Sequence, residues 1–201
     1  MSDHAQDFID QRLDSHLEWL NSEHASGRRF DVDDPDLASF NWSQVSLSEA
    51  DLREARLCGA RLAGVDFYAS RLAGAQLDGA VLDGANLAKA NLDEASLVAA
   101  SLRGTRAPRA TFAASDLRGA DLRDADLLKG YFHDADLRGA DFRGASLAFV
   151  SLTGTRVAGA QLQGVIDLNA ALTAWIDIGF TNPQRLDGPA AIVWLRELAK
   201  G

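Results

Sequence analysis

Apolar residues, nearly all of them large, return at every fifth position of this chain, from Trp42 to Leu162, without a single insertion. Leu or Phe occupies 22 of these 25 positions. The position two residues earlier holds a small residue (Ala, Ser, Thr, Gly or Val) in 24 of 25 cases, and the position two residues later holds Gly in 12 cases. The middle of the chain is therefore one five-residue unit, repeated without interruption.

Neither regular secondary structure buries residues that return every five positions. Five residues of an α-helix rotate by roughly 500°, a net 140°, so successive Leu side chains would scatter around the helix. In a straight β-strand an odd step places successive Leu side chains on opposite faces. A chain that turns a corner after every five residues keeps the small and the large residue inside. Gly suits such a corner because it adopts backbone angles that are costly for other residues.

The A(D/N)Lxx pattern, as in "ADLRDADLLKG" from residue 120, resembles the repeat of pentapeptide-repeat proteins over residues 36–164. This resemblance implies an all-β solenoid, a right-handed quadrilateral β-helix with four five-residue sides in each coil. The repeats then form about six coils, stacked about 4.8 Å apart as paired strands are. Large central residues are expected to fill the axis, among them Leu52, Leu57, Leu62, Phe67, Leu72, Leu122, Leu127, Phe132, Leu137 and Phe142.

Residues 1–35 are predicted to form an N-terminal helical cap and an acidic connector. Ile9, Leu13 and Leu17 lie at helical spacing and Gly27 follows, which predicts a helix over residues 4–25. The open end of a solenoid exposes unpaired backbone groups and apolar side chains, so we expect this helix to cover the first coil. The acidic stretch DVDDPD, residues 31–36, is either a solvated connector or a contact for a partner.

Residues 165–201 are predicted to form an irregular segment and a C-terminal helix. Asp187, Gly188 and Pro189 signal a helix start before AAIVWLRELAK. In several pentapeptide-repeat proteins the C-terminal end of the coil pairs two chains, so the resemblance implies a candidate homodimer seam along this helix. A second cap, folded onto its own coil, is the alternative. The residues in question are Ile192, Trp194, Leu195 and Leu198.

The formal net charge of −9 lies mostly outside the repeats, because residues 1–41 carry −7 and residues 42–164 only −1. Residues 20 apart should stack on one side of a four-sided coil, which places aspartates in short columns with arginines two positions along. Neighbouring opposite charges are usually a soluble surface and contribute little individually. As candidate partner-facing acidic positions we identify Asp116, Asp121, Asp126, Asp136 and Asp141.

The sequence carries no motif for catalysis, for a cofactor or for a metal. The single cysteine, Cys58, excludes a disulfide framework and a cysteine-based zinc cluster. No histidine is spaced from another His or Cys as metal ligands are, and no phosphate-binding glycine motif occurs. We therefore predict a chain that is not an enzyme and holds neither cofactor nor metal. The start MSDHAQDF and the absence of a long apolar run predict a cytosolic protein without a membrane partner.

One coil departs from the pattern. Ala107 and Pro108 interrupt the repeat, which predicts a bulge or looser packing near residues 103–109. Arg103, Arg106 and Arg109 form a basic patch there. The patch is too small to predict direct nucleic-acid binding in a chain whose pI is about 4.8.

Two functions are compatible with these features. The first is a scaffold or adaptor that displays a rigid surface to a protein partner of unknown identity. The second follows from the resemblance, since well-understood family members imitate duplex DNA and bind type II topoisomerases (gyrase or topoisomerase IV), which protects these enzymes from inhibitors. A DNA mimic needs continuous negative charge, and the repeats are nearly neutral. The sequence therefore favours the scaffold.

Overall fold

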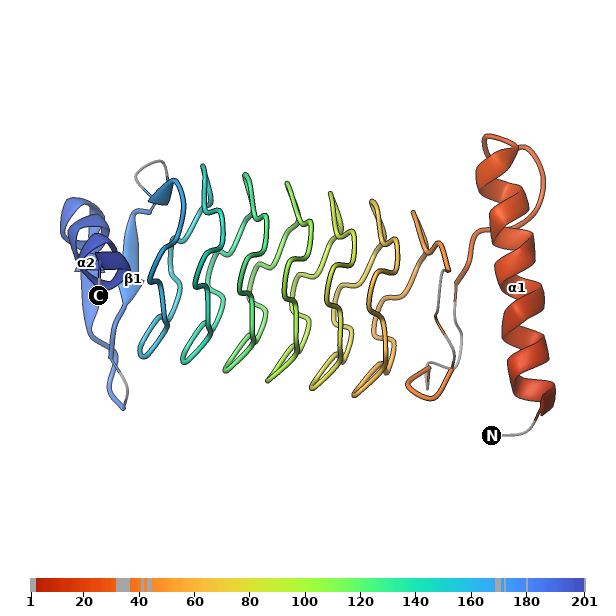
Figure 1. Cartoon of the computed structure of the whole chain (residues 1–201), viewed down its shortest axis with the longest axis horizontal. Helices are drawn as coiled ribbons and strands as arrows, with labels where there is room; N and C mark the ends of the chain where they lie inside the picture. Colours follow the sequence, from red (N-terminus) through yellow and green to blue (C-terminus); the bar gives the residue numbers. More distant parts are fainter. Residues whose placement is uncertain are drawn as a thin grey trace.

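The computed structural model describes residues 3–31, 37–40, 42, 45–168, 171, 173–179 and 181–200. Its named elements, in chain order, are helix α1 (Asp3–Asn21), strand β1 (Trp175–Asp177), strand β2 (Arg185–Asp187) and helix α2 (Gly188–Lys200). Figure 1 shows the repeats stacked as successive coils of a rod, with α1 at one end and β1, β2 and α2 at the other. Within the described part of the chain, neither helix has the length and hydropathy to span a bilayer.

Each coil contains 20 residues. Parallel bridges join residues 20 apart, as in the series Ser46, Asp66, Asn86, Arg106 and Asp126. Backbone hydrogen bonds lie along these bridges; the N–H of Leu77 donates to the carbonyl of Ser96 at 2.7 Å, and the N–H of Ser96 donates to Ala75 at 2.9 Å. Four five-residue sides therefore close one coil before the chain meets itself again.

The corners are turns with one left-handed residue. In one of them the N–H of Ala80 donates to the carbonyl of Leu77 at 3.0 Å, and Gly79 between them has φ +64°. A positive φ at the third residue is typical of a type II turn. The other described corners repeat this angle, and half of the corner residues are not glycine; Lys89 and Phe149 have φ +60° and +56°.

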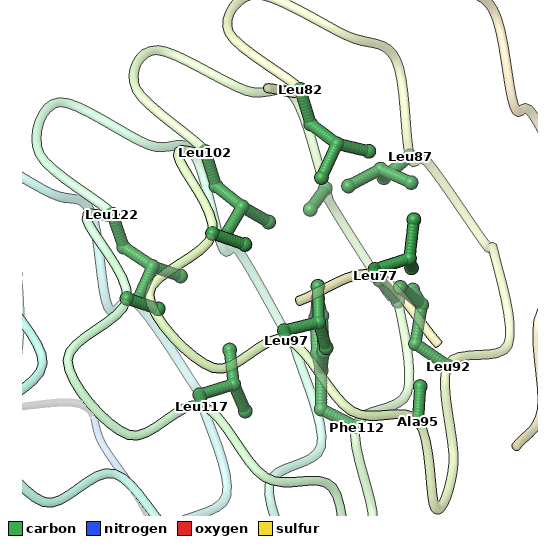
Figure 2. Packing of buried hydrophobic residues seen from close by; sticks show 14 of the residues in the cluster. Leu77, Leu82, Leu87, Leu92, Ala95, Leu97, Leu102, Phe112, Leu117 and Leu122 are labelled. Atoms are coloured by element: carbon green, nitrogen blue, oxygen red, sulfur yellow. The ribbon is translucent and has the colours of Figure 1, made fainter. Parts of the chain in front are cut away.

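The core is the axis of the coils. All ten central residues that the sequence analysis names are buried, with at most 2% of their surface exposed. Figure 2 shows Leu82, Leu102 and Leu122 as one row of side chains from successive coils. The rings of Phe112 and Phe132 stack with centroids 4.6 Å apart. Residues 20 apart thus repeat the same packing contact from coil to coil.

The expectation of a bulge at residues 103–109 is wrong, because the ladder of parallel bridges between coils continues through these residues. Arg106 bridges both Asn86 and Asp126, and the N–H of Ala107 donates to the carbonyl of Asp126 at 2.8 Å. Pro108 occupies the second position of the turn from Ala107 to Ala110. Proline is favoured there, since its fixed φ matches that turn position.

The N-terminal helix packs on the first coil. Ile9 and Leu13 are buried and belong to the same apolar core as the coils, while the N–H of Phe30 donates to Nδ1 of the buried His16 at 3.0 Å. The helix ends at Asn21, before the predicted residue 25, because Glu23 and His24 adopt positive φ. The ladder begins at Asp31, which bridges Asp51.

The C-terminal segment extends the ladder beyond the predicted repeats. Ile166 bridges Ser146, and Asp177 in β1 bridges Arg156. Strand β2 pairs antiparallel with β1, with Ile176 opposite Leu186. Helix α2 follows β2 directly and buries Ala191 and Leu195. This end of the rod is therefore covered by a two-stranded sheet and a helix of the same chain.

Candidate functional site

The outward surface of each side is formed by the residues immediately before and after its central residue and by the corner residue that follows them. Where these are Asp and Arg, they form a bidentate ion pair. Arg123 Nε and Nη2 donate to the two carboxylate oxygens of Asp121 at 2.9 and 2.8 Å. The same geometry joins Asp116 to Arg118, and further copies join Asp51 to Arg53, Asp136 to Arg138, and Asp141 to Arg143.

A second set of ion pairs crosses between coils. Arg103 Nε lies 2.5 Å from Asp121 Oδ2 in the next coil. Arg123 Nε lies 3.7 Å from Asp141 Oδ2. The carboxylates thus have arginines on two sides. The pKa of Asp121 is lowered, because hydrogen bonds from Arg123 and Arg103 favour its charged form over the opposing effect of burial.

Four of the five candidate acidic positions are tied to arginine in this way: Asp116, Asp121, Asp136 and Asp141. Asp126 differs, because Leu128 stands where the others have arginine; its Oδ1 accepts the backbone N–H of Leu128 at 3.1 Å. The structure does align the acids in columns, because Asp116 bridges Asp136 and Asp121 bridges Asp141. These columns carry little uncompensated negative charge, however.

Exposed apolar side chains gather on the C-terminal half of the rod, and sequence reasoning missed them. We call them the apolar patch: Leu128, Tyr131, Phe149 and Ile166, which are 37%, 52%, 54% and 54% exposed. By the 20-residue period, Leu128, Phe149 and Ile166 lie on the same side of successive coils, and Phe149 is the corner residue of that side. Tyr131 lies at the start of the next side. Lys129 Nζ lies 6.0 Å from the centre of the Phe149 ring. The sequence could have revealed this patch, because each of its residues is a large apolar residue at a position that the repeat places outward.

The candidate dimer stripe on α2 faces its own chain for much of its area. Leu195 is 1% exposed and belongs to the core, and Trp194 and Leu198 are partly buried against that core. Ile192 is half-buried, whereas Val193 is 55% exposed. Of the candidate acidic connector, residues 32–36 lie outside the described residues. Among those described, no three His, Cys, Asp or Glu side chains gather as a metal site requires.

The comparisons with known proteins agree with this architecture. A family model described as pentapeptide repeats matches with 8 copies, over residues 34–64, 60–97, 70–106, 95–129 and 131–166. The chain belongs to the pentapeptide-repeat family. Proteins of this family fold as right-handed quadrilateral β-helices, and the 20-residue ladder is the four-sided coil of that fold. No curated protein matches the sequence.

Several solved structures resemble parts of this chain. Rfr23 from the cyanobacterium Cyanothece 51142 is 28% identical over 46% of this chain and 63% of that one, with a TM-score of 0.45. HetL, involved in heterocyst differentiation regulation in the cyanobacterium Nostoc sp. strain PCC 7120, is 27% identical over 74% and 81%, with a TM-score of 0.39. Full-length QnrB1, a plasmid-mediated fluoroquinolone resistance protein, is 14% identical over 64% and 81%, with a TM-score of 0.40. No function follows from these similarities.

Proposed function

We propose that this chain is a non-enzymatic scaffold or adaptor that presents the apolar patch to a protein partner. The observation that carries the proposal is the exposure of Leu128, Tyr131, Phe149 and Ile166 on a continuous hydrogen-bonded ladder. Because the ladder fixes the backbone that carries these side chains, binding to them requires no ordering of the backbone. Large apolar and aromatic side chains are also the residues that contribute most to protein interfaces.

The ion pairs support this proposal over the DNA-mimic alternative. A mimic of duplex DNA offers a basic channel rows of carboxylates that are free to pair with it. Here Asp116, Asp121, Asp136 and Asp141 each already bind arginine, so a topoisomerase would have to displace these arginines first. The near-neutral repeats also provide weak electrostatic steering.

The same proposal assigns a role to the two ends of the rod, which α1 and α2 cover. The coils, about six in number, expose an apolar axis at each end, and a cap prevents end-to-end association. Helix α1 contributes Ile9 and Leu13 to the core, and α2 contributes Ala191 and Leu195, which supports a capping role for both helices. A homodimer through α2 would then use its outer surface, around Val193, rather than Leu195.

The experiment is a pull-down from the producer's own cytosol with the tagged wild-type chain and with Phe149→Asp, washed at low and moderate salt. Val81→Asp is the control, because Val81 is another exposed apolar residue, 37% exposed against 54% for Phe149, and lies on a different side of the coil. The scaffold proposal predicts a partner that survives the salt wash, is lost with Phe149→Asp and is retained with Val81→Asp. Gyrase or topoisomerase IV subunits that leave on addition of DNA would favour the mimic instead.

A further inference from the structure

A hollow of about 630 Å³ lies between α1 and the segment that returns from it to the first coil. Helix α1 contributes Arg12 and Trp19 to its lining, and the returning segment contributes His24, Arg28, Arg29 and Asp31. A volume of this size is typical of sites for small molecules and exceeds the volume of a single inorganic ion. It lies at the opposite end of the rod from the apolar patch.

The walls of this hollow are held by specific backbone contacts. Gly27 has φ +75° and lies so close to α1 that a Cβ there would collide with the carbonyl of Ser15 and the N–H of Trp19. The N–H of Arg28 donates to the carbonyl of Ser15 at 3.1 Å. The rings of Trp19 and His24 stack with centroids 3.9 Å apart. The returning segment is thus fixed along the helix and carries its arginines opposite Arg12.

The charge of the lining is positive, although residues 1–41 carry a net charge of −7. Three guanidinium groups and one carboxylate, Asp31, line the hollow, and Asp31 pairs with Arg12; the carboxylate of Glu49 lies beside the lining, 3.5 Å from Nε2 of His24. Arg29 Nε donates to the backbone carbonyl of Glu49, which is a neutral acceptor. Burial and the nearby charge of Arg71 lower the pKa of Arg29, and the carboxylates of Asp51 and Glu49 oppose this only in part. An anion in the hollow would stabilise these cations.

We propose that this hollow binds a small molecule that carries an oxyanion, either a phosphate or a carboxylate group, between Arg12, Arg28 and Arg29. Guanidinium groups present planar, paired donors that match both anions in a bidentate geometry. The stacked rings of Trp19 and His24 and the ring of Phe8 supply an apolar wall for the remainder of the ligand. This site is independent of the scaffold surface.

The test is a titration of the full chain with inorganic phosphate, pyrophosphate, ATP and citrate, followed by calorimetry and by the indole N–H signal of Trp19. The phosphate compounds and citrate separate the two sources of oxyanion. Saturable binding of at least one probe is expected at millimolar concentration or below. Arg28→Gln should weaken that binding about tenfold or more, because it removes charge-assisted hydrogen bonds.

Arg28 is suited to this test because its side chain is exposed, so that the variant should fold normally. Arg118→Gln is the matched control, since Arg118 is an arginine of the coil surface paired with Asp116. It should leave the affinity unchanged. The proposal is overturned if no probe binds saturably to the wild-type chain, or if Arg28→Gln and Arg118→Gln weaken binding equally, which would indicate non-specific attraction of anions.

Discussion

At the residue scale, the corners of the coil hold most of the backbone strain. A left-handed conformation costs a residue with a Cβ roughly 1–2 kcal/mol, and glycine avoids this cost. Half of the corners that the structure describes nevertheless carry other residues, such as Glu94 at φ +60° and Ala99 at φ +55°. The ladder imposes the angle whichever residue is present. The period of five predicts a corner in every unit, but it does not show that residues such as Phe149 adopt the same left-handed backbone as the glycines.

This strain should be measurable by opposite substitutions at two exposed corners, Gly84 and Ala99. Gly84 has φ +68°, and a Cβ there would meet nothing within 4 Å, so Gly84→Ala changes the backbone preference alone. We expect it to lower the free energy of unfolding by about 1 kcal/mol. The reverse change, Ala99→Gly, should raise the stability by a similar amount. Urea denaturation measures both, and equal signs for the two variants would contradict this account of the corners.

The ion pairs are a second residue-scale feature, and sequence reasoning anticipated only half of it. The period of 20 predicts that Asp121 and Asp141 lie in one column, and the bridges place them so. It does not predict the conformations of Arg123 and Arg103, which decide whether the carboxylates face solvent as free charges or as paired ones. The sequence already favoured neighbouring opposite charges on this surface, but side-chain conformation depends on neighbours in three dimensions, so the bidentate pairs and the contacts between coils came only from the fold.

At the element scale, one buried histidine of α1 accepts a hydrogen bond from the start of the coil. Nδ1 of His16 accepts the N–H of Phe30, the residue that immediately precedes the first bridge of the ladder. Burial lowers the pKa of His16 below its ordinary value of 6.5, and the charge of Arg29 acts in the same direction. The imidazole is therefore neutral in the folded chain at neutral pH, and Nδ1 remains an acceptor.

The sign of the pH dependence follows from this lowered pKa. As the pH falls below about 6.5, His16 is protonated in the unfolded chain before it is in the folded chain. The contribution of the neutral His16 to the stability is therefore complete above that pH and decreases as the pH falls. The carboxylates of Asp116 and Asp141, whose pKa values are also lowered, act only below about pH 3.8. Urea unfolding at pH 7.5 and 5.5 should show a loss in the wild type that is smaller in His16→Gln. Equal losses would assign the effect to other histidines.

Helix α2 allows the cap and the dimer seam to be separated. Leu195 is buried in the core of its own chain, so Leu195→Asp places an unpaired charge there and should destabilise the C-terminal end by several kcal/mol. Val193 is exposed, so Val193→Asp should change the free energy of unfolding by no more than about 0.5 kcal/mol. Thermal unfolding measures the stability, and the mass in solution reports on a dimer.

The outcomes of the two α2 variants distinguish the alternatives. A cap without a dimer predicts that only Leu195→Asp lowers the melting temperature and that neither variant changes the mass. A dimer through the outer surface of α2 predicts that Val193→Asp halves the mass. If Leu195→Asp unfolds at the wild-type temperature, α2 does not cap the coil. The sequence identified the apolar stripe of α2 but not the surface that it packs against, because the same stripe suits the coil of its own chain or that of a second copy.

At the scale of the whole molecule, the coil is nearly one-dimensional. Each coil contacts only the coils before and after it, so stability is approximately a sum of coil and interface contributions. The sequence predicts this architecture well, because a period that never slips over 25 repeats allows few other folds. It predicts the ends poorly. The returning segment at residues 22–31 depends on the contact of Gly27 with α1, which no periodicity reveals.

The one-dimensional architecture makes a prediction about deletions. Removing residues 67–86 takes out 20 residues, one complete coil, and joins Asp66 to Leu87, so that every later residue keeps its side of the rod. This variant should fold, be shorter by about 4.8 Å in solution scattering and be less stable than the wild type. Removing residues 67–83 instead takes out 17 residues and shifts every later side chain out of the five-residue register, so this chain should lose cooperative unfolding. If both deletions fold equally well, the register of the repeats does not determine the rod; if neither folds, its coils are more interdependent than a sum of neighbouring contacts allows.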